Sequence, residues 1–204
     1  MEILRRWRNG KRYACVFGTR MDYTAWSAMY TTPIRVRNGL YCLRDFDPSA
    51  APVVAGWARD AAELFWLAPS TPPPLTAAKV LGWQNADVCA LLFQREASDE
   101  LLGYLELNLM PAQTAHLWMG HCVIAPSHRG QGLGRMMVSM AMEHAFTHRK
   151  AESVSLIVFP DNVAAIECYK RVGFAAAGEQ LKDFRTTGRT HRMLRMLISR
   201  QQYA

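Results

Sequence analysis

The stretch Arg129-Gly130-Gln131-Gly132-Leu133-Gly134 lies between a run of mostly apolar residues, 116–125, and a segment with helical periodicity, 133–149. Glycine adopts backbone conformations that a side chain forbids, so three alternate glycines allow a tight turn with exposed N–H groups. A helix that begins at this turn adds a partial positive charge. The stretch therefore predicts a strand, a loop and a helix with an anion-binding site between them, typically for a phosphate group.

Two arginines flank this loop, Arg129 and Arg135. Both could be ordinary solvated cations, but positive charge opposes the dipole at a helix N-terminus, which favours a bound anion instead. Two common phosphate loops are excluded by spacing. No Gly-Lys-Ser/Thr follows, and Arg135 stands where a dinucleotide-binding loop would carry a third small residue.

A second motif follows downstream. Residues 153–159 read as a buried strand, and they lead through Pro160 and Asp161 to Asn162, a typical helix N-cap. Tyr169 comes seven residues later, about two helical turns, so both side chains can lie toward one end of a cleft. The alternative for Tyr169 is a place in the core.

Together the two motifs resemble the GNAT superfamily of acetyl-CoA-dependent N-acetyltransferases, over about residues 39–198. The resemblance implies acetyl-CoA as co-substrate, no metal, and a pyrophosphate on the N–H groups of residues 130–135. It implies that Tyr169 faces the thioester sulfur and protonates the departing thiolate. The implied cofactor-binding residues are Cys122, Val123, Ile124, Arg129, Gly130, Gln131, Gly132, Leu133, Gly134, Arg135 and Asn162. Cys122 and Ile124 would act through their backbone groups.

The general base is left open by the sequence. Glu106 lies inside an apolar strand, where burial of a carboxylate is costly and would raise its pKa toward a value useful for a base. The alternative is an outward-facing position on the strand. His121 and His116 are alternatives, and a water relay is a third. Many relatives carry an acidic residue where this chain has Trp118, which argues against direct base catalysis from that position.

The order of predicted elements favours an α/β (α+β) fold, and the resemblance implies a mixed, mostly antiparallel sheet with helices on both faces. The prolines at 72–74 predict a stiff loop after the first helix. Strands are expected at 39–46, 88–94, 101–110, 116–124, 154–159, 177–183 and 191–198, and helices at 53–67, 76–83, 133–149 and 163–172.

Charge divides the chain into a basic arm, residues 1–38, and a nearly neutral GNAT-like domain, residues 39–204. The arm carries eight of the 24 Lys and Arg residues but only two of the 17 acids. Such an arm could bind nucleic acid, an acidic surface or the ribosome, or it could pack on the domain through its aromatic residues. No recognised reader motif supports nucleic-acid binding. Five cysteines without metal-site or redox spacing, and no long apolar run, predict a soluble cytoplasmic protein without a membrane segment. A homodimer is left open.

The predicted function is therefore acetyl transfer from acetyl-CoA to a primary amine by direct attack, without a covalent enzyme intermediate. Two alternatives remain: a catalytically idle acyl-CoA-binding regulatory module, and a nucleic-acid or ribosome binder that uses the basic arm. The acceptor amine, of unknown size, is expected between residues 57–76, the strand carrying Glu106 and the loop 183–192.

Overall fold

A computed structural model describes residues 13–16, 19–22, 36–98, 100–110 and 115–203. The chain divides into two compact units, residues 1–34 and 35–204. In the first, β1 (Tyr13–Val16) and β2 (Thr19–Asp22) form an antiparallel hairpin. The remainder of the predicted basic arm lies outside the described residues, except for Val36–Asn38, which forms a strand of the second unit.

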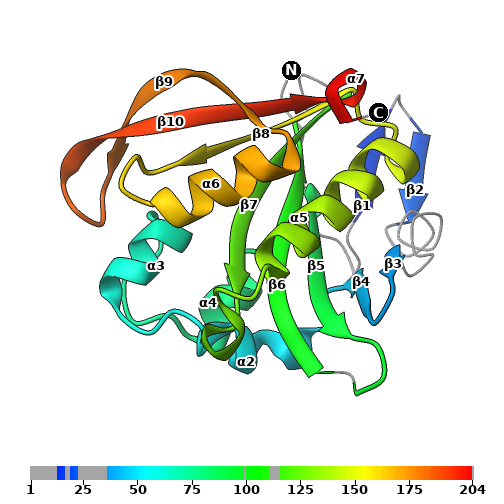
Figure 1. Ribbon diagram of the computed structural model, residues 1–204, viewed down its shortest axis with the longest axis horizontal. Helices are drawn as coiled ribbons and strands as arrows, with labels where there is room; N and C mark the ends of the chain where they lie inside the picture. The colour runs from blue at the N-terminus through cyan, green and yellow to red at the C-terminus, as the bar shows by residue number, and fades with distance from the viewer. Residues whose placement is uncertain (1–12, 17–18, 23–35, 99, 111–114, 204) are drawn as a thin grey trace. The chain divides into compact units, whose positions relative to one another are not determined.

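The second unit is built on one eight-stranded sheet with the order β3-β4-β5-β6-β7-β8-β10-β9 (Figure 1). All neighbouring strands pair antiparallel except β7 and β8, which are parallel. The predicted mixed, mostly antiparallel sheet is therefore confirmed. The strands are β3 (Val36–Asn38), β4 (Tyr41–Asp45), β5 (Val88–Arg95), β6 (Glu100–Leu109), β7 (His116–Ile124), β8 (Ser153–Val158), β9 (Ala175–Phe184) and β10 (Arg189–Ser199).

Helices cover both faces of this sheet because successive residues of its central strands point to opposite sides. On one side Leu91 and Leu105 belong to a core that includes α5 and α6, and on the other Leu92 and Tyr104 pack with α2 and α4. None of the helices in the described ranges has the length and apolar character needed to cross a membrane. The helices are η1 (Pro48–Ala50), α2 (Ala51–Ala55), α3 (Ala61–Leu67), α4 (Ala77–Gly82), η2 (Pro126–His128), α5 (Leu133–Glu143), the π-helical η3 (His144–His148), α6 (Val163–Val172) and α7 (Arg200–Tyr203).

Two predicted helices differ from the structure. The helix expected at 53–67 is divided, because α2 ends at Gly56 and α3 begins after Asp60, whose side chain accepts a hydrogen bond from the N–H of Glu63 at 2.8 Å. The helix expected at 133–149 is α-helical only to Glu143. Its last turn is a π-helix, in which the N–H of Arg149 bonds the carbonyl of His144.

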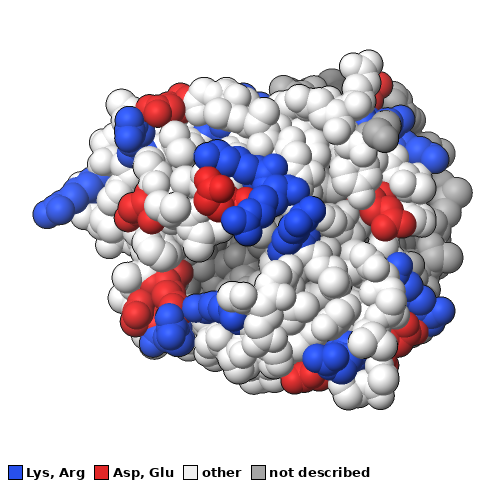
Figure 2. Space-filling view, in the orientation of Figure 1, with Lys and Arg blue, Asp and Glu red and all other residues white. Residues whose placement is uncertain are grey.

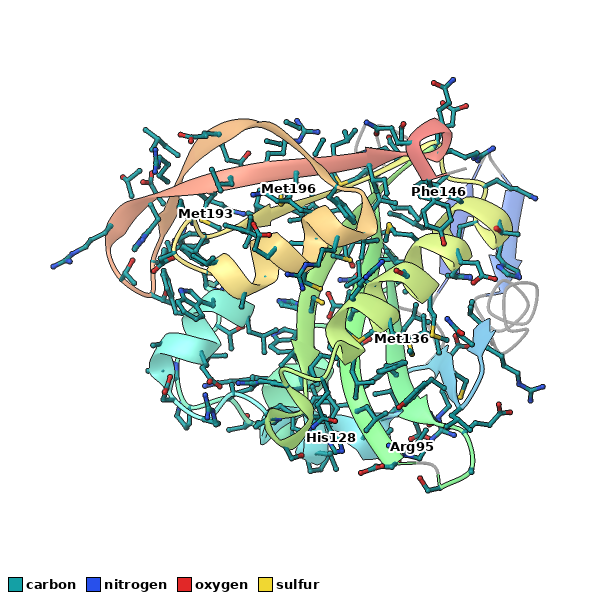
Figure 3. The ribbon with its side chains drawn as sticks, viewed as in Figure 1. Arg95, His128, Met136, Phe146, Met193 and Met196 are labelled. Atoms are coloured by element: carbon teal, nitrogen blue, oxygen red, sulfur yellow. The ribbon has the colours of Figure 1, made fainter. Side chains whose placement is uncertain are left out.

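Methionines fill much of the core. Met137, Met140 and Met142 of α5 are buried against the sheet, as their helical spacing predicts. On β10, Met196 belongs to the same core, whereas Met193 packs in a smaller cluster with Phe159 and Phe184 (Figure 3). The three side chains of this smaller cluster line a cavity together with His121.

The feature that positions the site is the divergence of β7 from β8. Their parallel pairing covers only three residue pairs, from His116–Ser153 to Trp118–Ser155. Beyond these pairs β7 continues to Ile124 and β8 to Val158 without pairing to each other. Among the strands that the structure describes, none covers this edge of the second half of β7.

Candidate active site

A cavity of about 440 Å³ occupies the space where β7 and β8 diverge. It is lined by the second half of β7, the end of β8, the start of α5 and one face of α6, with residues 57–67 on the other side. Figure 2 shows this face of the molecule hollowed near its centre, with Lys and Arg side chains beside the hollow. Its volume is in the range of small-molecule sites, which is about 300–1,000 Å³.

The predicted glycine loop lies at one end of the cavity. Gly130 and Gly132 have φ angles of +76° and +78°, which side chains other than glycine rarely adopt. Gly132 is also the N-cap of α5 and offers no side-chain cap, so the first N–H groups of the helix are left for another acceptor. Leu133 is buried in the core and fixes the loop, and Gln131 bonds the carbonyl of Ser127.

Arg129 is engaged by protein groups. Its Nε donates to the carbonyl of Ile124 at 3.0 Å, and its other two nitrogens reach Oε1 of Glu63 at 2.9 Å and the carbonyl of Trp57 at 2.8 Å. It therefore holds the end of β7 against the segment before α3. Because Arg59 and then Arg129 bind Glu63, the pKa of this carboxyl falls to about 2. The sequence predicts Arg129 as an anion ligand, and the three hydrogen bonds to protein groups were not expected from it.

Two other arginines place positive charge near Cys168, one of the residues that line the cavity. Burial raises the pKa of the Cys168 thiol, and the charges of Arg171 and Arg135 oppose this shift, so both guanidinium groups lie near Cys168. Cys168 in turn lines the cavity and approaches Gly134, where an added Cβ would lie 3.6 Å from its Sγ. Arg135 was predicted and Arg171 was not, although its position in the last turn of α6 beside Tyr169 is a usable signal.

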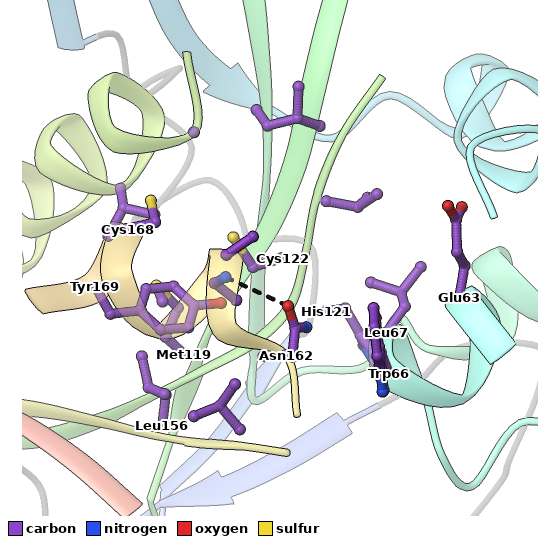
Figure 4. Close-up of a pocket in the computed structure, with 18 of the residues that line it drawn as sticks. Glu63, Trp66, Leu67, Met119, His121, Cys122, Leu156, Asn162, Cys168 and Tyr169 are labelled. Atoms are coloured by element: carbon purple, nitrogen blue, oxygen red, sulfur yellow. Dashed lines mark hydrogen bonds between the residues drawn. The ribbon is translucent and has the colours of Figure 1, made fainter. Parts of the chain in front are cut away.

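Asn162 and Tyr169 both line the cavity, from the start and from the second turn of α6 (Figure 4). Oδ1 of Asn162 accepts a hydrogen bond from the N–H of Ala165 at 3.3 Å, so this side chain caps α6 as predicted. The amide nitrogen remains as a donor beside the cavity. The Tyr169 hydroxyl points toward Cys122 and interacts with its thiol, and burial raises the pKa of Tyr169 well above its usual value.

His121 and Glu106, two separate candidates for the general base, are hydrogen-bonded to each other. Nδ1 of His121 lies 2.8 Å from Oε2 of Glu106. The Glu106 side chain is only 2% exposed and lines neither this cavity nor a smaller one beside it, whereas the His121 side chain is 27% exposed and lines both. Glu106 therefore reaches the cavity only through the imidazole.

Further contacts fix this pair. The hydroxyl of Tyr104 donates to Oε1 of Glu106 at 2.5 Å and accepts a hydrogen bond from Nε2 of Gln84 at 2.8 Å. The ring of Trp83 stacks on His121, with centroids 4.1 Å apart and 17° between the planes. Glu106 is thus an acceptor for two donors. With Nδ1 donating, Nε2 of neutral His121 carries the lone pair.

A β-bulge aims His121. The pairing of β6 with β7 shifts between Tyr104 and Glu106, and His121 has a φ of +40°, which is rare for a residue with a side chain. His116, the third candidate, lies elsewhere. Its two ring nitrogens are 2.8 and 2.7 Å from the hydroxyls of Ser153 and Ser155, and burial lowers its pKa. It lines neither of the two cavities, so the structure does not support it as a base.

A second cavity of about 220 Å³ adjoins the first, and His121 lines both. Residues 66–71 and the β9–β10 hairpin contribute to its wall, close to the predicted acceptor site, but Glu106 does not. Trp118, which replaces the acidic residue of many relatives, lines this second cavity. Within the described ranges, no group of three or more His, Cys, Asp or Glu side chains is arranged to hold a metal ion.

Comparison with known proteins identifies a family that matches this chain. The model of the acetyltransferase (GNAT) family matches residues 53–174, which include the glycine loop, Asn162 and Tyr169. A crystal structure of spermidine N-acetyltransferase from Vibrio cholerae, in complex with CoA and spermine, superposes with a TM-score of 0.69 over 81% of this chain and 99% of that one. At 19% identity this likeness shows the fold.

Similar sequences have known activities. Spermidine N(1)-acetyltransferase of Escherichia coli K12 is 33% identical over 81 residues, which are 40% of this chain and 44% of that protein. Mycothiol acetyltransferase of Tsukamurella paurometabola is 34% identical over 80 residues, 39% of this chain and 27% of that protein. The chain thus aligns with less than half of each of these two relatives, and their acceptors are chemically different.

Proposed function

The chain belongs to the acetyltransferase (GNAT) family, and on this premise we propose that it transfers the acetyl group of acetyl-CoA to a primary amine. The amine nitrogen attacks the thioester carbon, a C–N bond forms and the C–S bond breaks. The ammonium proton goes to a base before attack, and the thiolate receives a proton as it leaves. No acyl-enzyme intermediate is needed.

The observation that carries this proposal is the divergence of β7 from β8 beside the glycine loop. An edge of β7 without a strand partner can pair with the amide groups of an extended ligand, as sheet edges do with peptides. The pantetheine arm of CoA carries such amides. Cys122 would contribute backbone groups here, whereas the carbonyl of Ile124 is already bonded by Arg129.

The loop fits a pyrophosphate. Gly130 and Gly132 turn the chain without side chains in the way, and the N–H groups at the start of α5 lack a side-chain cap. Arg135 adds positive charge in the first turn of α5, and Arg171 adds positive charge near Cys168. Gln131, Leu133, Gly134 and Val123 support the loop or the cavity wall, and the amide nitrogen of Asn162 is a donor for the pantetheine arm.

We assign the base to His121, with Glu106 as a positioning residue. Nε2 of His121 accepts the ammonium proton, and the Glu106 carboxylate stabilises the imidazolium that forms, since Nδ1 already donates to it. Trp83 stacked on the ring and Tyr104 bonded to the carboxylate hold both groups in place.

We assign the general acid to Tyr169. Burial keeps its pKa well above the usual value, so the hydroxyl is protonated at neutral pH and can donate to a thiolate. Burial also raises the pKa of Cys122 to about 12. A thiol that stays protonated is a poor nucleophile, which supports direct attack of the amine.

The other expectations remain proposals. We expect a cytoplasmic protein, because the five cysteines of the sequence are widely spaced and include no C-x-x-C pair. A homodimer, the division at residue 38 and a role for the basic arm also remain predictions. The family match favours neither the idle CoA-binding module nor the nucleic-acid binder.

The test is thiol release from acetyl-CoA with a panel of primary amines, with reactions lacking the amine as background. We expect release that depends on the amine, together with stabilisation by acetyl-CoA of about 2.7 kcal/mol at a hundredfold excess over its dissociation constant. Stabilisation by ATP or NAD but not by CoA would contradict the assignment of the cavity. Binding of CoA without turnover of any amine would favour the regulatory module.

A further inference from the structure

The charge around the second cavity bears on which amine enters, an inference that rests on the proposed function. His121, which we assign as the base, is one of the residues that line this cavity, whose volume is about 220 Å³. Its walls are largely aromatic or apolar, with Trp66, Trp118, Phe159 and Phe184 among them. An apolar body of about one ring and a short chain fits this space.

Among the described residues that line this cavity, Lys182 is the charged one besides the titratable His121. Its Nζ lies over the ring of Phe184, 5.6 Å from the centroid. A cation that already faces this aromatic ring repels a second cation from it, and the ring is a usual binding surface for ammonium groups. The cavity mouth therefore disfavours an acceptor with a second positive charge.

Carboxylates that could balance a second ammonium are engaged elsewhere. Among the described residues that line the two cavities, Glu63 is the acidic one, and it is paired with both Arg59 and Arg129. Glu106 is buried behind His121 and accepts from Tyr104. Each of these carboxylates has cationic or donor partners of its own.

We propose that the acceptor is a small primary amine with an apolar, preferably aromatic body and a single positive charge, and not a polyamine. The ammonium is the reacting group beside His121, the body fills the aromatic cavity, and Lys182 attracts an anionic substituent at the mouth. This acceptor class differs from the polyamines named for the spermidine acetyltransferases, whose fold the chain shares.

The experiment uses phenethylamine and its para-carboxylate and para-aminomethyl derivatives, each of which differs from phenethylamine by one charge. Spermidine serves as the polyamine. Turnover is followed by thiol release, and binding in the presence of CoA by calorimetry. We expect the carboxylate to exceed the aminomethyl compound by about tenfold in kcat/KM and in affinity, with phenethylamine between them and spermidine last. Potassium chloride at high concentration should reduce the spread.

Two charge reversals test the role of Lys182, an exposed residue on the edge strand β9. Lys182→Glu should invert the order of the carboxylate and aminomethyl compounds. Arg37→Glu makes the same charge change on β3, the strand at the opposite edge of the sheet. It should leave the preference for the carboxylate over the aminomethyl compound unchanged. An unchanged order in Lys182→Glu, or spermidine as the best substrate, would overturn the proposal.

Binding separates this inference from the proposed function. If no amine is acetylated but calorimetry gives the expected order of affinities, the cavity assignment stands and the transfer reaction does not. If spermidine is acetylated fastest, the transfer reaction stands and the assigned acceptor class is wrong.

Discussion

Nδ1 of His121 lies 2.8 Å from Oε2 of Glu106 across the bulge in the pairing of β6 with β7. The two residues stand 15 positions apart in the chain, and neither alone combines a charge-stabilising group with access to the cavity. The buried carboxylate supplies the charge and the half-buried imidazole supplies the access. The pair acts as one unit.

Replacement of this pair should change activity in a way that depends on pH. We expect His121→Gln to lower kcat/KM by ~10²-fold or more at pH 7. The loss should shrink as the pH rises toward the pKa of the substrate amine, because a larger fraction of the amine is then already neutral and needs no base. Glu106→Gln should show the same trend, and the double variant should lose no more than His121→Gln alone, because the residues act through one group.

The control for this series is His128→Gln, which removes an imidazole that pairs with Glu100 outside the cavity. Its pH profile should match that of the parent protein. CoA affinity is measured for every variant to show that the fold is kept. Losses that add in the double variant would contradict the coupling of the two residues. Unchanged pH profiles would indicate that water, and not His121, is the base.

Tyr169→Phe should lower kcat while leaving the dissociation constant of acetyl-CoA nearly unchanged. The ring still packs against Phe174, with centroids 5.9 Å apart, and only the proton donor is lost. We expect a decrease of ~10²-fold or more. Tyr203→Phe is the matched control, since that hydroxyl bonds the carbonyl of Ser139 on α5. Equal kcat for the parent and Tyr169→Phe proteins would return Tyr169 to a packing role.

Gly132→Ala should weaken CoA binding more than Cys122→Ala does. A side chain at the φ of +78° costs about 1–2 kcal/mol and displaces the N–H groups of the loop, whereas Cys122 would act through its backbone. Gly39→Ala is the control for strain, because Gly39 has a φ of +61° in the turn between β3 and β4. Both glycine variants should unfold at lower denaturant, but only Gly132→Ala should lose affinity in calorimetry.

Gly132→Val should enlarge this effect. If its CoA affinity equals that of Gly39→Ala, the pyrophosphate does not lie on this loop. Gly134→Val adds bulk next to Cys168 and Ile124 and should also weaken binding.

Local sequence patterns were sufficient for much of this architecture. The apolar run, the alternate glycines and the helical period after them specify β7, the loop and α5 through neighbouring residues only. Helix α6 was predicted with its observed bounds, because Asn162 gives a start signal and Gly173, with a φ of +112°, a stop signal. Such signals act within one or two turns.

Contacts between distant segments could not be predicted in this way. Arg129 bonds Glu63, 66 residues away, and this depends on how the first turn of α3 packs on the end of β7. The His121–Glu106 pair depends on a bulge, and a shift of one residue in register reverses the side of the sheet that a residue faces. One available signal was overlooked: Asp60 followed by Glu63 marks the helix start that divides residues 53–67.

His144 should make stability depend on pH. It is buried in η3, neither ring nitrogen is hydrogen-bonded to a residue in the described ranges, and burial lowers its pKa to about 4. The unfolded chain binds the proton more readily, so stability is full above about pH 6.5 and falls as the pH drops toward 4. We expect a loss on the order of 2 kcal/mol from pH 7 to pH 5 in urea unfolding. His144→Leu should remove most of this loss, leaving the smaller contribution of His116, and an equal pH dependence in both proteins would show that other groups are responsible.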